Sequence, residues 1–100
     1  MHFIALCTDR PGGLDIRMQH RPEHLAWLEA NKARVLLAGP FLDAAGQMNG
    51  SMLVIEAADE ADAKAFLGGD PFARAGLFSA SEVKPWRRDR RQERLWRRPR

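Results

Sequence analysis

The 100-residue sequence has a single cysteine, Cys7, and no long run of apolar residues. One cysteine excludes an intramolecular disulfide and a metal cluster held by several thiolates. No stretch approaches the roughly 18 apolar residues that a membrane-spanning helix needs. The short apolar start has no Lys or Arg before it, unlike a secretory signal peptide. These absences predict a cytoplasmic protein with no membrane association.

The sequence also lacks the usual signatures of metal, phosphate and dinucleotide sites. It contains no zinc-ligand spacing, Walker loop, G-x-G-x-x-G motif or recognisable Ser–His or Cys–His nucleophile pair. His20 and His24 are four residues apart, a spacing typical of metal-binding helices, but no third ligand is evident and Pro22 lies between them. We therefore expect neither a metal nor a cofactor.

The basic charge of the chain is confined to its C-terminal end. The whole sequence has a net charge of +3, but residues 1–86 carry eight basic and eleven acidic side chains, which gives 8 − 11 = −3. Residues 87–100 carry eight arginines against two acidic residues, which gives 8 − 2 = +6. We interpret residues 1–86 as one domain and residues 87–100 as a solvated, flexible tail.

The apolar pattern predicts two helical regions and four strands. Strands are expected at residues 3–8, 35–38, 51–57 and 77–83, bounded by turn-forming residues. The first helical region runs from residue 14 to about residue 34. A kink is expected before Pro22, which begins a second helical segment, because proline lacks the N–H that a helix interior requires. Asp59 is the expected N-cap of the second helix. Residues 39–40 are expected to close the second strand, and residues 43–50 to form a hairpin loop.

This β-α-β-β-α-β order is typical of a ferredoxin-like α+β fold, with a four-stranded antiparallel sheet and both helices on one face. The strands should then alternate between apolar and polar residues, because the other face of the sheet would meet water. The first strand does not alternate, since Ile4 and Leu6 oppose Phe3, Ala5 and Cys7. A second copy of the same sheet is the simplest cover for this additional apolar face. We predict a homodimer that packs sheet against sheet.

His24 and Asp70 are the candidate catalytic residues. Each has a structural interpretation, His24 as a boundary histidine bonded to backbone and Asp70 as the N-cap of the turn that begins at Pro71. A carboxylate held by backbone N–H groups can still orient an imidazole, so the same residues are compatible with general base catalysis. The sequence leaves open whether the two side chains meet.

Arg17, Arg21 and Ser51 are candidates for binding a substrate. The two arginines lie one helical turn apart and are suited to holding an anionic group, although a solvated or salt-bridged face is the alternative interpretation. Ser51 follows Gly50 at the start of a strand and would supply a hydroxyl to the same cavity. Serine is also common at strand starts, so this signal is weak.

Several segments together resemble the YciI-like (YCII-related) family over residues 2–86. In chain order they are Arg21-Pro22-Glu23-His24-Leu25-Ala26-Trp27-Leu28, Leu36-Leu37-Ala38-Gly39-Pro40, Gly50-Ser51, Asp70-Pro71-Phe72 and Ala75-Gly76-Leu77-Phe78. The resemblance implies a dimeric α/β barrel and a His–Asp pair in a cavity near the dimer interface, at positions that match His24 and Asp70. One branch of this family eliminates chloride from a chlorinated aromatic. The Arg-rich extension lies outside the usual family pattern.

Three classes of function follow from these observations. The first is a cofactor-free enzyme acting on a small molecule, such as a lyase, isomerase or dehydrochlorinase, with His24 moving a proton and Asp70 fixing its tautomer. The second is a non-catalytic dimeric module that binds a small ligand. The third, less favoured, is weak and salt-dependent nucleic-acid binding through the Arg-rich tail.

Overall fold

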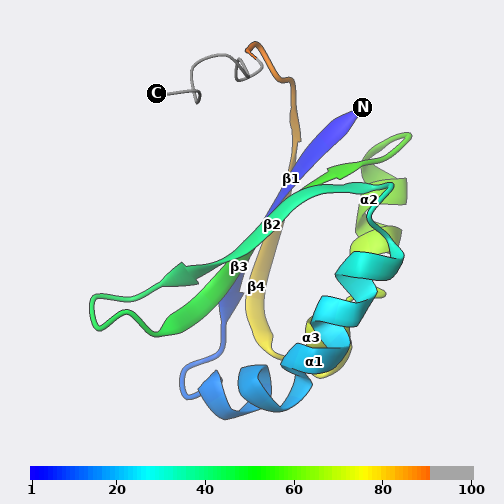
Figure 1. Ribbon diagram of the computed structural model, residues 1–100. Coiled ribbons are helices and arrows are strands. Elements are labelled where there is room, and N and C mark those ends of the chain that lie inside the picture. The colour runs from blue at the N-terminus through cyan, green and yellow to red at the C-terminus, as the bar shows by residue number, and fades with distance from the viewer. Residues whose placement is uncertain (91–100) are drawn as a thin grey trace, which may run out of the picture.

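The computed structural model describes residues 1–90 and consists of one sheet covered by helices on one side. Figure 1 shows this two-layer arrangement. The sheet order is β2-β3-β1-β4, with antiparallel pairing throughout. The expected ferredoxin-like α+β fold with a four-stranded antiparallel sheet is therefore confirmed. The elements in chain order are β1 (His2–Asp9), α1 (Leu14–Ala30), β2 (Val35–Leu42), β3 (Met48–Glu56), α2 (Glu60–Leu67), α3 (Pro71–Arg74) and β4 (Phe78–Trp86).

Both edge strands continue through a proline. The prediction that residues 39–40 close the second strand is wrong, because β2 continues past Pro40 to Leu42. One side of an edge strand makes no ladder hydrogen bonds, so a residue without an N–H is tolerated there. The other edge strand, β4, continues past Pro85 to Trp86 for the same reason, beyond the predicted end at residue 83.

Two further boundaries differ from the prediction. The strand β3 begins at Met48, inside the predicted loop of residues 43–50. The helix α1 ends at Ala30 and passes through Pro22 as one element, so the predicted extent to residue 34 and the division into two segments are wrong. The expected change of direction is visible in Figure 1, where the first turns of α1 run at an angle to the rest of the helix. Proline removes the hydrogen bond to the carbonyl of Met18 four residues earlier. Met18 is 52% exposed, which lets water replace the missing donor.

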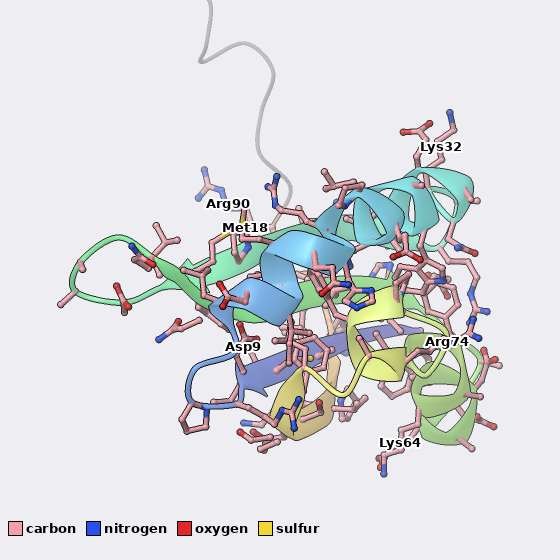
Figure 2. The ribbon with its side chains drawn as sticks, turned by 90° about the horizontal axis from the view of Figure 1, so that it is seen from below. Asp9, Met18, Lys32, Lys64, Arg74 and Arg90 are labelled. Atoms are coloured by element: carbon pink, nitrogen blue, oxygen red, sulfur yellow. The ribbon has the colours of Figure 1, made fainter. Side chains whose placement is uncertain are left out.

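The core lies between the sheet and the helices. On this face the sheet contributes side chains that are at most 6% exposed, namely Phe3, Ala5, Cys7, Leu53 and Ile55. Asp59 caps α2 as expected, accepting a hydrogen bond from the backbone N–H of Asp62 at 2.8 Å. In Figure 2, Lys32, which follows α1, and Lys64 of α2 point outward on opposite sides of the molecule. These charged residues therefore leave the sheet-facing side to apolar packing and to the polar groups described next.

Candidate functional site

His24 of α1 and Asp70, which precedes α3, form a buried hydrogen-bonded pair. The Nδ1 atom of His24 lies 2.8 Å from Oδ1 of Asp70. The same oxygen accepts the backbone N–H of Phe72 at 3.0 Å, so the predicted capping role of Asp70 is confirmed. The carboxylate is only an acceptor, so Nδ1 carries the proton and the lone pair of neutral His24 lies on Nε2. His24 is thus bonded to a carboxylate and not, as the structural interpretation had it, to backbone.

The ring of Phe72 fixes the orientation of the imidazole. The two rings stack with their centroids 4.0 Å apart and their planes 15° from parallel. Phe72 is fully buried, and the guanidinium carbon of Arg17 lies 4.6 Å from the centre of the same ring. Because its ring packs against the side chains of both His24 and Arg17, Phe72 sets their relative position.

Arg17 is the centre of a second buried polar group. Its Nε and Nη2 atoms donate to the two carboxylate oxygens of Asp9 at 2.8 and 2.9 Å. Nη2 also donates to the carbonyl of Gly50 at 2.9 Å and to Oγ of Ser51 at 2.8 Å. Arg17 is 2% exposed, so of its two alternative interpretations the salt-bridged one is correct and the solvated one is wrong. The forked geometry of the guanidinium suits this set of acceptors.

A cavity of about 100 Å³ connects the two polar groups. Four of the five candidate residues line it, namely Arg17, Arg21, His24 and Ser51, whereas Asp70 lies behind His24. The remaining wall is largely apolar and comes from α1, β2, β3 and Phe72. Within residues 1–90, every buried side-chain nitrogen or oxygen has a hydrogen-bond partner. Nε2 of His24 and Nη1 of Arg17 have no partner there, so both atoms are accessible from the cavity.

One member of the site, Asp9, was not found from the sequence, and it pairs with Arg17. A signal for Asp9 was present, because alternation along β1 puts it on the same inward face as Cys7 and Ala5. A carboxylate at an inward strand position needs a buried cationic or hydrogen-bonding partner. Phe72 was expected from the sequence as a core or cavity-wall residue, which is confirmed, whereas its stacking on His24 was not predicted.

His20 takes no part in this arrangement. Its Nδ1 lies 3.1 Å from Oε1 of Glu23 on the surface of α1. Across the described range 1–90, no group of three or more His, Cys, Asp or Glu residues is arranged to hold a metal ion. In the same range no helix is both long and apolar enough to cross a membrane.

Cys7 of β1 does not line this cavity and is 6% exposed. Burial raises the pKa of the Cys7 thiol above its ordinary value of 9.0, and the negative charges of Asp70 and Asp9 raise it further. A hydrogen bond with Ser81 and the charge of Arg17 oppose this shift without cancelling it. The thiol therefore stays protonated at neutral pH and does not have the thiolate character of a catalytic nucleophile.

Solved structures with the same fold include one at substantial sequence identity. The 5-chloro-2-hydroxyhydroquinone dehydrochlorinase (TftG) from Burkholderia phenoliruptrix AC1100, in complex with 2,5-dihydroxybenzoquinone, is 39% identical with a TM-score of 0.81. The similarity covers 87% of this chain and 94% of that one. A crystal structure described as an antibiotic biosynthesis monooxygenase from Bacteriodes thetaiotaomicron VPI-5482 shares the fold at 17% identity and a TM-score of 0.56, covering 93% and 95% of the two chains.

Sequence comparison gives a consistent result. The protein YciI of Escherichia coli O6:H1 is 30% identical over 96 residues, which cover 88% of this chain and 98% of the relative. A protein of Haemophilus influenzae is 29% identical with the same coverage. The model of the YCII-related domain matches residues 1–87. The resemblance expected from the short motifs is thereby confirmed, and the chain belongs to the YCII-related domain family.

Proposed function

We propose that this chain is a small-molecule enzyme in which His24 and Asp70 carry out cofactor-free proton transfer, in a lyase, isomerase or dehydrochlorinase type of reaction. The observation that carries the proposal is the 2.8 Å contact between Nδ1 of His24 and Asp70, with Nε2 of the same ring open to a cavity. A general base must reach its proton within about 3 Å or through one water, and Nε2 is the only ring atom placed to do so.

In the proposed reaction, Nε2 of His24 removes a proton from the bound substrate. In an elimination the electron pair left on the substrate forms a new double bond, and the leaving group departs with its own electron pair, so no oxidant or reductant is consumed. Asp70 stabilises the resulting imidazolium through Nδ1–H, and Phe72 holds the ring in place by stacking. In an isomerisation the same ring would return the proton at another atom of the substrate.

We infer that the substrate is a small ring with an oxyanion or hydroxyl group. The cavity of about 100 Å³ has a mainly apolar wall, with Nη1 of Arg17 and the side chain of Arg21 available for a negative oxygen. The related dehydrochlorinase, at 39% identity, acts on a chlorinated hydroxyhydroquinone. That compound has such a ring and supplies a first substrate to test here.

We also propose a homodimer that packs sheet against sheet. The face of the sheet opposite the helices has apolar side chains on three adjacent strands, namely Ile4, Leu6, Leu37, Met52 and Val54. Leu37 is 52% exposed in the single chain. An identical copy is the partner that matches this face in size and apolar character.

We retain the division of the chain at residue 86 as a proposal. β4 ends at Trp86, and residues 87–90 are exposed and have no regular structure. Most of the Arg-rich tail lies outside the described residues, so weak nucleic-acid binding stays a prediction. It is tested by comparing the full chain with one ending at Trp86 for binding to a short DNA duplex at low and high salt. Equal binding by the two chains would exclude the tail.

Chloride release from 5-chloro-2-hydroxyhydroquinone tests the catalytic proposal. Replacing a general base lowers the rate about 10²- to 10⁴-fold, so His24→Ala should lose most activity. His20→Ala is the matched control, because His20 lies one turn away on α1 and outside the cavity. Equal turnover by His24→Ala and the wild type would refute the assignment.

The alternative function is a dimeric ligand-binding module. Binding of 2,5-dihydroxybenzoquinone by this chain, without turnover of any member of a panel of related hydroxylated rings, would support it. In that case His24→Ala should change only the affinity for the ligand.

A further inference from the structure

A second cavity, of about 290 Å³, lies on the other side of the His24–Asp70 pair. His24 lines the first cavity and Asp70 the second, while Leu53 contributes to both walls. The second cavity lies between the β1–β4 side of the sheet and the helices α2 and α3. Its apolar wall consists of Ala5, Leu53, Leu67, Ala73, Phe78 and Val83.

One oxygen of Asp70 is available to this cavity. Oδ1 is used by Nδ1 of His24 and by the backbone N–H of Phe72, whereas Oδ2 has no hydrogen-bond partner among the described residues. No buried side-chain oxygen in the described part of the chain lacks a partner, so Oδ2 must lie at an accessible surface. Asp70 is 2% exposed and lines the second cavity but not the first, so Oδ2 is the oxygen placed to meet a donor in the second cavity.

We propose that this cavity is a second ligand site, which takes a small, neutral, mainly apolar molecule with one hydrogen-bond donor, such as an alcohol or a phenol. A carboxylate oxygen only accepts hydrogen bonds, so the ligand must supply the donor. The apolar walls favour a hydrocarbon body. An anion would be repelled by Asp70, and a cation would lose its hydration against the apolar walls.

The size of the cavity is compatible with a small ligand. A volume of about 290 Å³ is close to the lower end of the range for small-molecule sites. The wall also includes the polar groups of Asp70, before α3, and of Ser81, on β4.

Binding at Oδ2 would be transmitted directly to His24, because the other oxygen of the same carboxylate holds the imidazole. A donor at Oδ2 withdraws negative charge from Asp70 and changes its hydrogen bond with Nδ1. The ¹⁵N chemical shifts of the His24 ring should therefore respond to a ligand that does not touch the ring. This readout does not depend on any enzymatic activity.

The test is a titration of the full chain with benzyl alcohol and with toluene, followed by methyl NMR. We expect saturable shifts at the methyl groups of Leu67, Ala73 and Val83 and at the His24 ring, without comparable shifts at Leu25 or Leu28 of the first cavity. Toluene lacks the donor and should bind roughly tenfold more weakly, since hydrogen bonds to a charged group contribute about that much.

A cavity-filling variant and its control locate the site. Ala73→Met should weaken benzyl alcohol binding at least about tenfold, because the longer side chain occupies the volume. Ala75→Met adds the same side chain at a position that lines neither cavity and should bind like the wild type. Ser81→Met, which enters the same cavity from an exposed position on β4, replaces Ala73→Met if that variant does not fold.

Three results would overturn the proposal. They are non-saturating shifts, saturable shifts confined to Leu25 and Leu28, and equal affinities for benzyl alcohol and toluene.

Discussion

Asp70 holds His24 with the same oxygen that caps the short helix α3. The two side chains are 46 positions apart in the sequence, and their atoms are 2.8 Å apart in the fold. Because Oδ1 also accepts the backbone N–H of Phe72, the carboxylate is held in place independently of its contact with the imidazole. Local structure and candidate chemistry therefore depend on one atom, and substitutions at Asp70 can separate the two roles.

Asp70→Asn should retain the fold but lose activity. The amide can keep an oxygen as the cap of α3, while its neutral charge no longer stabilises an imidazolium. We expect a fall of about 10²- to 10⁴-fold in turnover and a small change in stability. Asp70→Ala should add a loss of about 1–3 kcal/mol in the free energy of unfolding, because His24 and Phe72 each lose a buried partner. Urea denaturation and chloride release measure the two effects separately. Equal stability of the Asn and Ala variants would contradict the capping role.

Asp9→Ala should destabilise the protein severely. Arg17 and Asp9 form a forked ion pair whose side chains are 3% and 4% exposed. Removing one partner leaves a buried charge without compensation, which costs about 3–5 kcal/mol. Glu60→Ala is the control, because it breaks the exposed Glu60–Lys64 pair and should cost less than about 1 kcal/mol. Urea unfolding of both variants measures the difference, and similar costs would show that the Arg17 cluster contributes little to the fold.

Gly50→Ala should disturb both the sheet and the site. A Cβ at this position would lie 2.6 Å from the carbonyl oxygen of Cys7 on the neighbouring strand, so backbone must move. The carbonyl of Gly50 accepts from Arg17, and its displacement would weaken that contact as well. We expect a loss of about 1–3 kcal/mol in the free energy of unfolding. Gly39→Ala has open space around the new Cβ and should cost little. Equal free energies of unfolding for the two variants would show that β1 and β3 move apart at little cost to accommodate the new Cβ.

Leu37→Glu should convert the proposed dimer to a monomer without unfolding it. Leu37 lies on the face of the sheet opposite the helices and is 52% exposed in the single chain. A charge at this position is therefore tolerated in a monomer, but it is unfavourable where a second apolar sheet covers it. Lys32→Glu changes an exposed residue in the turn after α1 and should leave assembly unchanged. Sedimentation equilibrium at micromolar concentration gives the mass of each species. A wild-type mass of 11.3 kDa, that of one chain, would contradict the proposed dimer.

Cys7 should react slowly with a disulfide reagent in the native protein and quickly after denaturation. Its pKa is raised above 9.0, first by burial and then by nearby carboxylates, so little thiolate is present at neutral pH. The unfolded chain loses the thiol proton at lower pH than the folded chain does. The contribution of the Cys7 thiol to the free energy of unfolding is therefore fully present below about pH 9, and it declines as the pH rises above that value. Urea unfolding of the wild type and Cys7→Ala between about pH 7 and about pH 10 measures this decline. Parallel pH profiles for the two proteins would contradict the shift.

Local signals predicted much of the fold. The positions of turn residues located the four strands, and the capping roles of Asp59 and Asp70 follow from preferences that act within a few residues. The errors at Pro40 and Pro22 arose because tolerance of a proline depends on where its element lies. An edge strand needs no N–H on its open side, and an exposed helix turn can bond to water.

By itself, the sequence determined the element order, the caps, the opposite net charges of residues 1–86 and 87–100, and the identity of the candidate residues. These properties depend on composition and short-range geometry. Only the tertiary structure decided that His24 meets Asp70, that Arg17 is buried against Asp9, and that the two polar groups share a cavity. Such contacts join residues from different elements. Their distances depend on how α1 and α3 pack on the sheet, which no local pattern specifies.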